Sequence, residues 1–120
     1  MTAAQRLQLA AVLGASGVAC GAFGAHGLED LVTPDRLATW ETAARYHQIH
    51  AVALLALALV GKEGRTLAFG LMLAGTLVFA GSLYLLVLLD ISWLGAVTPV
   101  GGLLLIAGWG SLVLSAKEKG

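Results

Sequence analysis

The chain has 120 residues, of which 58% are hydrophobic and 12% are charged, and its mean hydropathy is +0.87. Soluble domains carry about 25% charged residues, so this composition excludes a soluble globule and, being rich in apolar residues, also excludes disorder. The formal net charge is zero, so the overall field of the protein gives no reason to expect nucleic acid as a partner.

Three long stretches of the chain lack Asp, Glu, Lys and Arg, namely residues 7–28, 66–89 and 91–116. Each stretch exceeds the roughly 20 helical residues that cross a bilayer core of about 30 Å. Lipid offers no water to backbone N–H and C=O groups, so each stretch is expected to form an uninterrupted helix. They predict the first, third and fourth membrane spans, at 6–26, 66–89 and 94–115.

The second apolar stretch is shorter and begins with polar residues. Its wholly apolar part, residues 51–60, is too short to cross a bilayer by itself. Upstream, Thr33, Pro34 and Asp35 are typical of a helix start, because they supply a capping residue, a first-turn proline and a first-turn acid. Nothing between them and Val60 breaks a helix. We therefore expect one long helix that begins outside the core and crosses it at 46–61.

Four spans predict an all-α integral membrane four-helix bundle, a single domain over residues 1–120, with a short amphipathic helix in the first outer loop. The expected connections are a long first one, a tight second one and a short third one, at 27–45, 61–65 and 90–93. An even number of spans places both termini and the second connection on one side of the membrane.

The basic residues predict the orientation of these spans. The side with both termini carries five of them, Arg6, Lys62, Arg65, Lys117 and Lys119. The opposite side carries only Arg36 and Arg45. Cytoplasmic loops are enriched in Lys and Arg, so the N-terminus and the C-terminus are predicted to be cytoplasmic.

Glycines recur at spacings that suit helix contacts. The first span contains Gly17-x-x-x-Gly21-x-x-x-Ala25, a pattern that lets two helix backbones approach closely in lipid. We predict helix-packing roles for eight glycines: Gly14, Gly17, Gly21, Gly24, Gly81, Gly101, Gly102 and Gly108. The same pattern also suits the seam of a homo-oligomer, and the sequence does not separate the two.

Several motifs occur in order along nearly the whole chain: Gly21-Ala22-Phe23-Gly24-Ala25-His26-Gly27, Trp40-x-Thr42, Gly81-Ser82-Leu83-Tyr84 and Thr98-Pro99-Val100-Gly101-Gly102. In these motifs the sequence resembles the YgdD/YwdK family of small four-span bacterial membrane proteins, which is similar to the eukaryotic transmembrane-protein-256 group. The resemblance implies the four-span architecture and a bacterial plasma (inner) membrane. It implies no particular activity.

Polar and aromatic residues gather in the outer half of the predicted bundle. His26 closes the first span, Trp40, His47 and His50 lie at the start of the second, and Tyr84 lies in the outer half of the third. Ionisable groups at membrane depth are costly and are therefore candidates for function. We predict that these five residues line one binding pocket on the outer side.

The second helix divides its polar residues between two faces. At 100° per residue, Trp40, His47 and His50 share one face, and a nearly opposite face carries Glu41, Arg45 and Gln48. Both faces cannot point into the bundle. We predict that the histidine face points inward, toward His26, and that the other face meets headgroups or water.

Three interpretations of the histidines remain open. They are hydrogen-bonded residues that fix the loop, ligands of a metal or haem together with Cys20, or the lining of a pocket for a lipid headgroup, quinone or other amphiphile. No CxxC motif or carboxylate spacing favours a metal, so no metal or cofactor is assigned. The sequence also lacks a Gly-x-Ser-x-Gly nucleophile elbow, and its first span lacks the acidic residue of small multidrug exporters.

The preferred hypothesis is a non-enzymatic structural or accessory membrane protein. It would bind a protein partner or membrane lipid at its outer end, as a homo-oligomer or in a larger membrane complex. The alternative is a transporter, or a membrane protein that binds a small molecule, metal, quinone or haem through the outer histidines.

Overall fold

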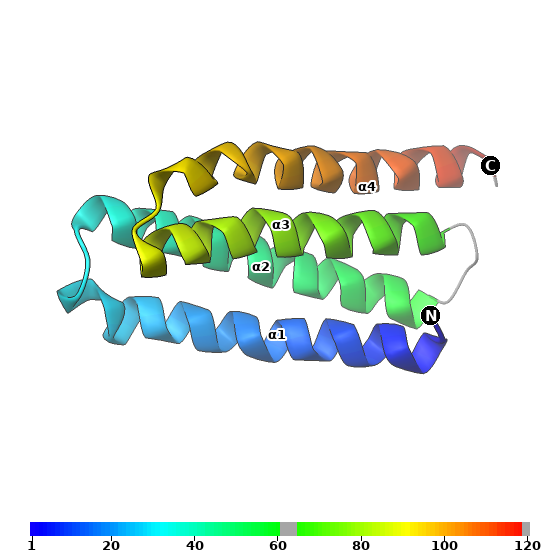
Figure 1. The fold of residues 1–120 in the computed structure, drawn as a ribbon. Coiled ribbons are helices and arrows are strands. Elements are labelled where there is room, and N and C mark those ends of the chain that lie inside the picture. Colours follow the sequence, from blue (N-terminus) through cyan, green and yellow to red (C-terminus); the bar gives the residue numbers. More distant parts are fainter. Residues whose placement is uncertain (61–64, 119–120) are drawn as a thin grey trace.

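Four helices run antiparallel in the computed structural model, which describes residues 1–60 and 65–118 (Figure 1). They are α1 (Ala3–His26), α2 (Pro34–Val60), α3 (Thr66–Leu89) and α4 (Thr98–Glu118), with short 3-10 helices η1 (Leu28–Asp30) and η3 (Ser92–Ala96) in the connections. All four are long and apolar enough to cross a membrane. The chain is therefore an all-α, four-span membrane bundle, as its sequence predicts.

The second span is one long helix of 27 residues that begins at Pro34. The Thr33 hydroxyl accepts a hydrogen bond from the Arg36 N–H at 3.2 Å, so Thr33 caps the first turn. The short amphipathic helix expected in the first outer loop is not a separate α-helix, because this segment forms the three-residue η1 and the first turns of α2. The predicted end of this span at Gly61 and the tight connection through residue 64 lie outside the described residues.

The fourth span, predicted at 94–115, lies within an apolar segment at 92–116 that contains two elements. Residues 92–96 form η3, and α4 starts at Thr98. The reason is Pro99, which has no N–H to donate and would clash with the carbonyl four residues earlier, so it is tolerated only in a first turn. The preceding helix ends where Asp90 adopts a left-handed conformation, with φ 54° and ψ 46°.

Each helix packs on the next one along the chain: α1 on α2, α2 on α3, and α3 on α4. In the most apolar 18-residue window of each helix, 44% of residues are buried in α2 and 39% in α3, against 22% in α1. In the fourth span, at 92–116, 17% of the residues of such an 18-residue window are buried. Figure 1 accordingly shows α1 and α4 at opposite edges of the bundle. The two edge helices therefore present most of their side chains outward.

Glycines admit side chains of α2 into the surface of α1. A Cβ added at Gly24 would lie 2.7 Å from Trp40 Cδ1, and one at Gly21 would lie 2.5 Å from Gln48 Nε2. A Cβ at Gly17 would also press on Gln48. These three glycines therefore lie at close contacts between α1 and α2, where small residues are expected.

Between α3 and α4 the glycines differ in how closely they pack. A Cβ at Gly101 would collide with the backbone of Phe79, and one at Gly108 would lie 2.7 Å from Met72 Cγ. At Gly102 the nearest atom would be at 3.8 Å, an ordinary contact. Gly75, which is not among the eight glycines with predicted packing roles, also packs closely on Leu105.

Gly14 and Gly81 do not make the packing contacts predicted for them within this chain. A Cβ added at either position would meet no atom within 4 Å. The spacing rule selects small residues without showing which of them face a neighbouring helix. Both glycines instead border hollows on the sides of the bundle.

Candidate functional site

The inward face of α2 carries the polar residues that the sequence selects. Trp40 is 4% exposed, and His47 and His50 are each 5% exposed. On the other face, Glu41 and Arg45 are exposed, whereas Gln48, although exposed overall, turns to α1 and donates through Nε2 to the Gly17 carbonyl at 2.8 Å. The histidine face points inward as predicted, but the prediction that Gln48 meets headgroups or water is wrong. Trp40 lies near the start of α2, toward the end of the bundle that holds connections 27–33 and 90–97, whereas His47 and His50 lie near the middle of this helix. We call that end, on the left in Figure 1, the loop end.

His47 joins three helices through a chain of hydrogen bonds. Its Nδ1 lies 2.8 Å from the Tyr84 hydroxyl on α3, and its Nε2 lies 3.0 Å from Ser16 Oγ on α1. The Ser16 hydroxyl donates to the Leu13 carbonyl at 3.2 Å. A hydroxyl has one hydrogen, so Ser16 accepts from the His47 Nε2–H. A neutral imidazole carries a single N–H, so in the neutral ring Nδ1 accepts from the Tyr84 hydroxyl.

A recess of about 270 Å³ lies beside this chain, between α1, α2 and α3. Its polar residues are Ser16, Cys20, His47, Thr76 and Tyr84. The Thr76 hydroxyl donates to the Met72 carbonyl of its own helix at 2.7 Å, so no hydrogen is left for the recess. The recess is thus a mainly apolar hollow with one hydrogen-bonded polar chain along its wall.

Trp40 packs next to the recess without lining it. Its Nε1–H donates to the Cys20 carbonyl at 2.8 Å. Its ring centroid lies 4.5 Å from that of Tyr84 and 5.6 Å from that of Phe23. Trp40 therefore fixes α2 against α1 and α3 at the loop end.

His50 turns toward α4 and away from the recess. Its Nδ1 lies 2.8 Å from the Tyr46 carbonyl, and the Trp109 Nε1–H donates to its Nε2 at 3.1 Å. A carbonyl can only accept and an indole N–H can only donate. The proton must therefore be on Nδ1, and both ring nitrogens of His50 are paired in a single arrangement. The sequence analysis did not select Trp109 as a partner for a histidine.

The single pocket predicted from five residues is not formed. His47 and Tyr84 line the recess and Trp40 packs beside it, whereas His50 faces α4 and His26 is exposed at the end of α1. Residues one turn apart on a helix can face different neighbours, and the chain turns away directly after His26. Within residues 1–60 and 65–118, no three His, Cys, Asp or Glu residues come close enough to hold a metal ion, so a three-histidine site is also not formed.

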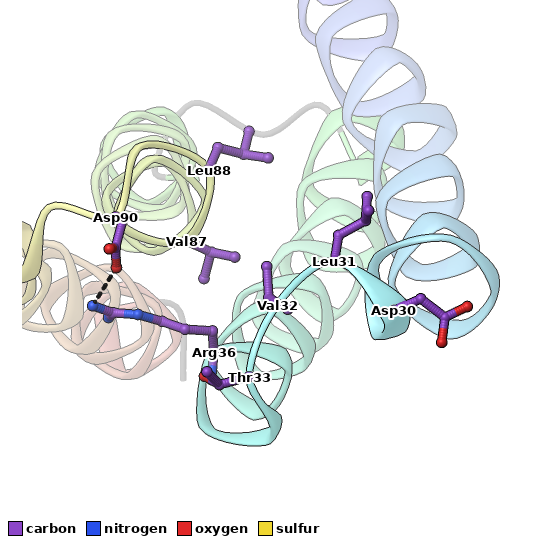
Figure 2. Close-up of a pocket in the computed structure, with 8 residues that line it drawn as sticks. All are labelled: Asp30, Leu31, Val32, Thr33, Arg36, Val87, Leu88 and Asp90. Carbon is purple, nitrogen blue, oxygen red and sulfur yellow. Dashed lines mark hydrogen bonds and ion pairs between the residues drawn. The ribbon is translucent and has the colours of Figure 1, made fainter.

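A second hollow, of about 530 Å³, lies at the loop end (Figure 2). Arg36 Nη2 donates to Asp90 Oδ1 at 2.9 Å and to Ser92 Oγ at 3.0 Å, so it ties the start of α2 to the segment after α3. The Arg36 side chain is 26% exposed and that of Asp90 is 82% exposed. Figure 2 shows Asp30 on the opposite side and the apolar Val87 on the wall.

Sequence analysis missed this loop-end pocket because its ion pair joins residues 54 positions apart. In the sequence, Arg36 bears only on membrane orientation. The signal that could single it out is its rarity, because it is one of only two basic residues predicted at this end of the protein.

Comparisons with known proteins agree with this architecture. A family model described as "Protein of unknown function (DUF423)" matches residues 20–102. The UPF0382 membrane protein YwdK of Bacillus subtilis is 44% identical over 115 residues, which cover 92% of this chain and 94% of that protein. The UPF0382 membrane proteins SAB0533 of Staphylococcus aureus and SH2409 of Staphylococcus haemolyticus are each 41% identical over 118 residues, covering 91% of this chain and 95% of theirs. No solved structure gives a significant match.

Proposed function

Since the chain belongs to the DUF423 family of UPF0382 membrane proteins, we propose that it is a non-enzymatic accessory protein of the bacterial plasma membrane that binds a phospholipid headgroup at its loop end. The proposal includes the orientation predicted from the basic residues, with the loop end outside and both termini in the cytoplasm. The observation that carries the proposal is the hollow around Arg36.

The position and chemistry of this hollow suit a headgroup. It lies where α2 begins and α3 ends, the depth at which a bilayer changes from hydrocarbon to headgroups. Arg36 uses Nη2 for Asp90 and Ser92, and no side chain in the described part of the chain accepts from its Nε or Nη1. A guanidinium binds phosphate oxygens through paired N–H groups. Leu31 and Leu88 also line the hollow, and both are exposed, so they offer an apolar surface for an acyl chain.

The charges around Arg36 favour a zwitterionic lipid over an anionic one. The loop end carries five acids, Glu29, Asp30, Asp35, Glu41 and Asp90, against two arginines. A headgroup with net negative charge is repelled by this surplus. An ethanolamine phospholipid satisfies both signs, because its phosphate pairs with Arg36 and its ammonium pairs with Asp90 or Asp30.

Lipid retention tests the headgroup proposal. The purified full chain is delipidated in detergent and titrated with phosphatidylethanolamine or phosphatidylglycerol, and bound lipid is counted by native mass spectrometry. Phosphatidylethanolamine is expected to bind more tightly, and Arg36→Ala to weaken it about tenfold, equivalent to about 1.4 kcal/mol. Arg45→Ala is the matched control, because it removes the other basic residue at this end, which does not line the hollow.

A second variant separates headgroup binding from damage to the fold. Asp90→Asn keeps a residue that tolerates the left-handed conformation and still offers an oxygen to Arg36. It is expected to reduce the preference for ethanolamine over glycerol headgroups without loss of folded protein, because four acids still outnumber the two arginines at this end. Equal binding of both lipids by the unaltered chain, or equal losses in the two arginine variants, contradicts the proposal.

Cysteine labelling tests the proposed orientation. Cys20 is the only cysteine and is replaced by Ala, and Ser92→Cys or Thr2→Cys is then introduced. In intact cells we expect an impermeant maleimide to label position 92 and not position 2, and to label both after permeabilisation. Labelling of position 2 in intact cells contradicts the orientation.

A further inference from the structure

The recess between α1, α2 and α3 points to a binding site separate from the loop-end pocket. We propose that it binds the ring of a quinone, with one ring carbonyl accepting a hydrogen bond from the Tyr84 hydroxyl. The proposal stands on the depth and size of the recess and on the hydrogen-bond chain through His47.

The depth of the recess excludes lipid headgroups and the ester carbonyls just beneath them. At 1.5 Å per residue, Tyr84 lies about 9 Å from Asp90 along α3, and Thr76 lies about 12 Å farther. Both positions fall within a hydrocarbon core of about 30 Å. An occupant with a polar atom at this depth must carry that atom on a largely apolar body.

The size of the recess suits one ring. A volume of about 270 Å³ corresponds to roughly nine water molecules at their share of liquid volume, which is the scale of one substituted six-membered ring. Two acyl chains with a glycerol backbone do not fit. The isoprenoid or alkyl tail of a quinone would leave the recess sideways into the membrane.

The hydrogen-bond chain can run in two directions without leaving a buried group unpaired. In the direction described above, Tyr84 donates to His47, which donates to Ser16. In the reverse direction, Ser16 donates to His47 Nε2, and the His47 Nδ1–H donates to Tyr84. The Leu13 carbonyl then keeps its α-helical bond, and the Tyr84 hydroxyl hydrogen is released toward the recess.

These two directions match both forms of a quinone. The reverse direction offers a donor to a quinone carbonyl, and the present direction leaves a lone pair on the Tyr84 oxygen for a quinol hydroxyl. An ester or ether oxygen can only accept a hydrogen bond, so it can use only the reverse direction of the chain. A site whose polar group serves either as donor or as acceptor therefore favours the quinone class.

Tryptophan fluorescence provides the binding assay. Trp93→Phe and Trp109→Phe leave Trp40 as the only tryptophan of the three. Because the Trp40 ring lies 4.5 Å from that of Tyr84, a quinone in the recess should quench it. The full chain in phosphatidylcholine nanodiscs is titrated with decylubiquinone, and decylbenzene serves as a probe with a ring and tail but no carbonyl. Saturable quenching is expected with decylubiquinone alone.

Two pairs of variants test the position of the ring. Tyr84→Phe is expected to weaken binding about tenfold, whereas Tyr46→Phe alters the other tyrosine, which does not line the recess, and should leave binding unchanged. Gly81→Leu fills the recess from a position where an added Cβ meets no atom within 4 Å, and it should abolish binding. Gly70→Leu is its control, because Gly70 has equal space and lies away from the recess.

Nitrogen NMR of His47 tests the reversal itself. We expect the ring proton on Nε2 without decylubiquinone and on Nδ1 when it is bound. Quenching that Gly81→Leu and Tyr84→Phe both leave unchanged overturns the proposal, because Gly81→Leu removes the recess without touching the hydrogen-bond chain. Non-saturable quenching, equal to that of free tryptophan in the same nanodiscs, also overturns it.

Discussion

His47 and His50 lie one turn apart on α2 and are equally buried, yet their surroundings give them different properties. His50 lies between a carbonyl and an indole N–H, two groups with fixed hydrogen-bonding roles. His47 lies between two hydroxyls, each of which can donate or accept. The hydrogen bonds around His50 therefore have one possible arrangement, and they connect α2 to α4. The hydrogen bonds around His47 have two possible arrangements, and they border the recess.

This difference shows that the residue type alone does not define a candidate site. Buried polar groups in a membrane need partners, and any complete set of partners stabilises the fold. Only partners with exchangeable roles can meet a ligand without leaving a group unpaired. We therefore interpret the α4 side of the bundle as structural and the α1 side as the side of binding.

The largest predicted effect comes from replacing each histidine by leucine. His50→Leu leaves the Trp109 N–H without its acceptor and should lower the free energy of unfolding by about 1–3 kcal/mol. His47→Leu leaves the Tyr84 hydroxyl without its acceptor and should cost a similar amount, about 1–3 kcal/mol, but it alone should abolish quinone quenching. Unfolding in mixed micelles and the Trp40 assay measure the two effects. Loss of quinone quenching in His50→Leu would contradict this assignment of the two sides.

Two glycines extend the same contrast. Gly108→Ala places a methyl group 2.7 Å from Met72 Cγ and 3.3 Å from the Met72 backbone nitrogen, and should destabilise the α3–α4 contact by about 1–2 kcal/mol. Gly81→Ala enters open space and should stabilise α3 by about 0.5–1 kcal/mol, the helix preference of alanine over glycine. The shift of the unfolding midpoint measures the change in stability of each variant. Destabilisation by Gly81→Ala would show that an unseen neighbour, such as a second copy of the chain, occupies the recess side.

The smallest effect is expected at the loop end. Asp90→Asn removes the charge from an ion pair whose acid is 82% exposed, and such pairs contribute at most about 1 kcal/mol in water. We expect a loss below about 0.5 kcal/mol that disappears at high salt. Comparison of unfolding at low and high salt measures it. A loss as large as that of His50→Leu would mean that the surface ion pair, rather than the buried contacts, fixes the loop end.

The sequence was sufficient to predict the spans and the inward face of α2. Charge-free stretches and the Thr33-Pro34 start are local signals, and they decide where helices exist. The 60° between His47 and His50 on the helix is too small to separate them by pattern, yet it is enough to turn one toward α1 and the other toward α4. Which neighbour lies on each side is a property of the assembled bundle.

For the same reason, the sequence pattern does not show which of Gly14 and Gly17 faces a neighbouring helix. Both are glycines of the first span for which packing roles are predicted, but only Gly17 faces Gln48. Arg36 and Asp90 are close only because α2 begins and α3 ends at the same level of the bundle. Contacts between elements therefore had to come from the structure.

One wall of the recess is α1, an edge helix that packs mainly on α2. A molecule that enters beside this helix arrives laterally, out of the bilayer, without crossing an aqueous phase. Occupancy would then follow the mole fraction of the molecule in the lipid rather than its molar concentration in the buffer. Lengthening the tail of a probe would change how much of it partitions into the membrane, while the fraction of protein occupied at a given membrane content would stay the same.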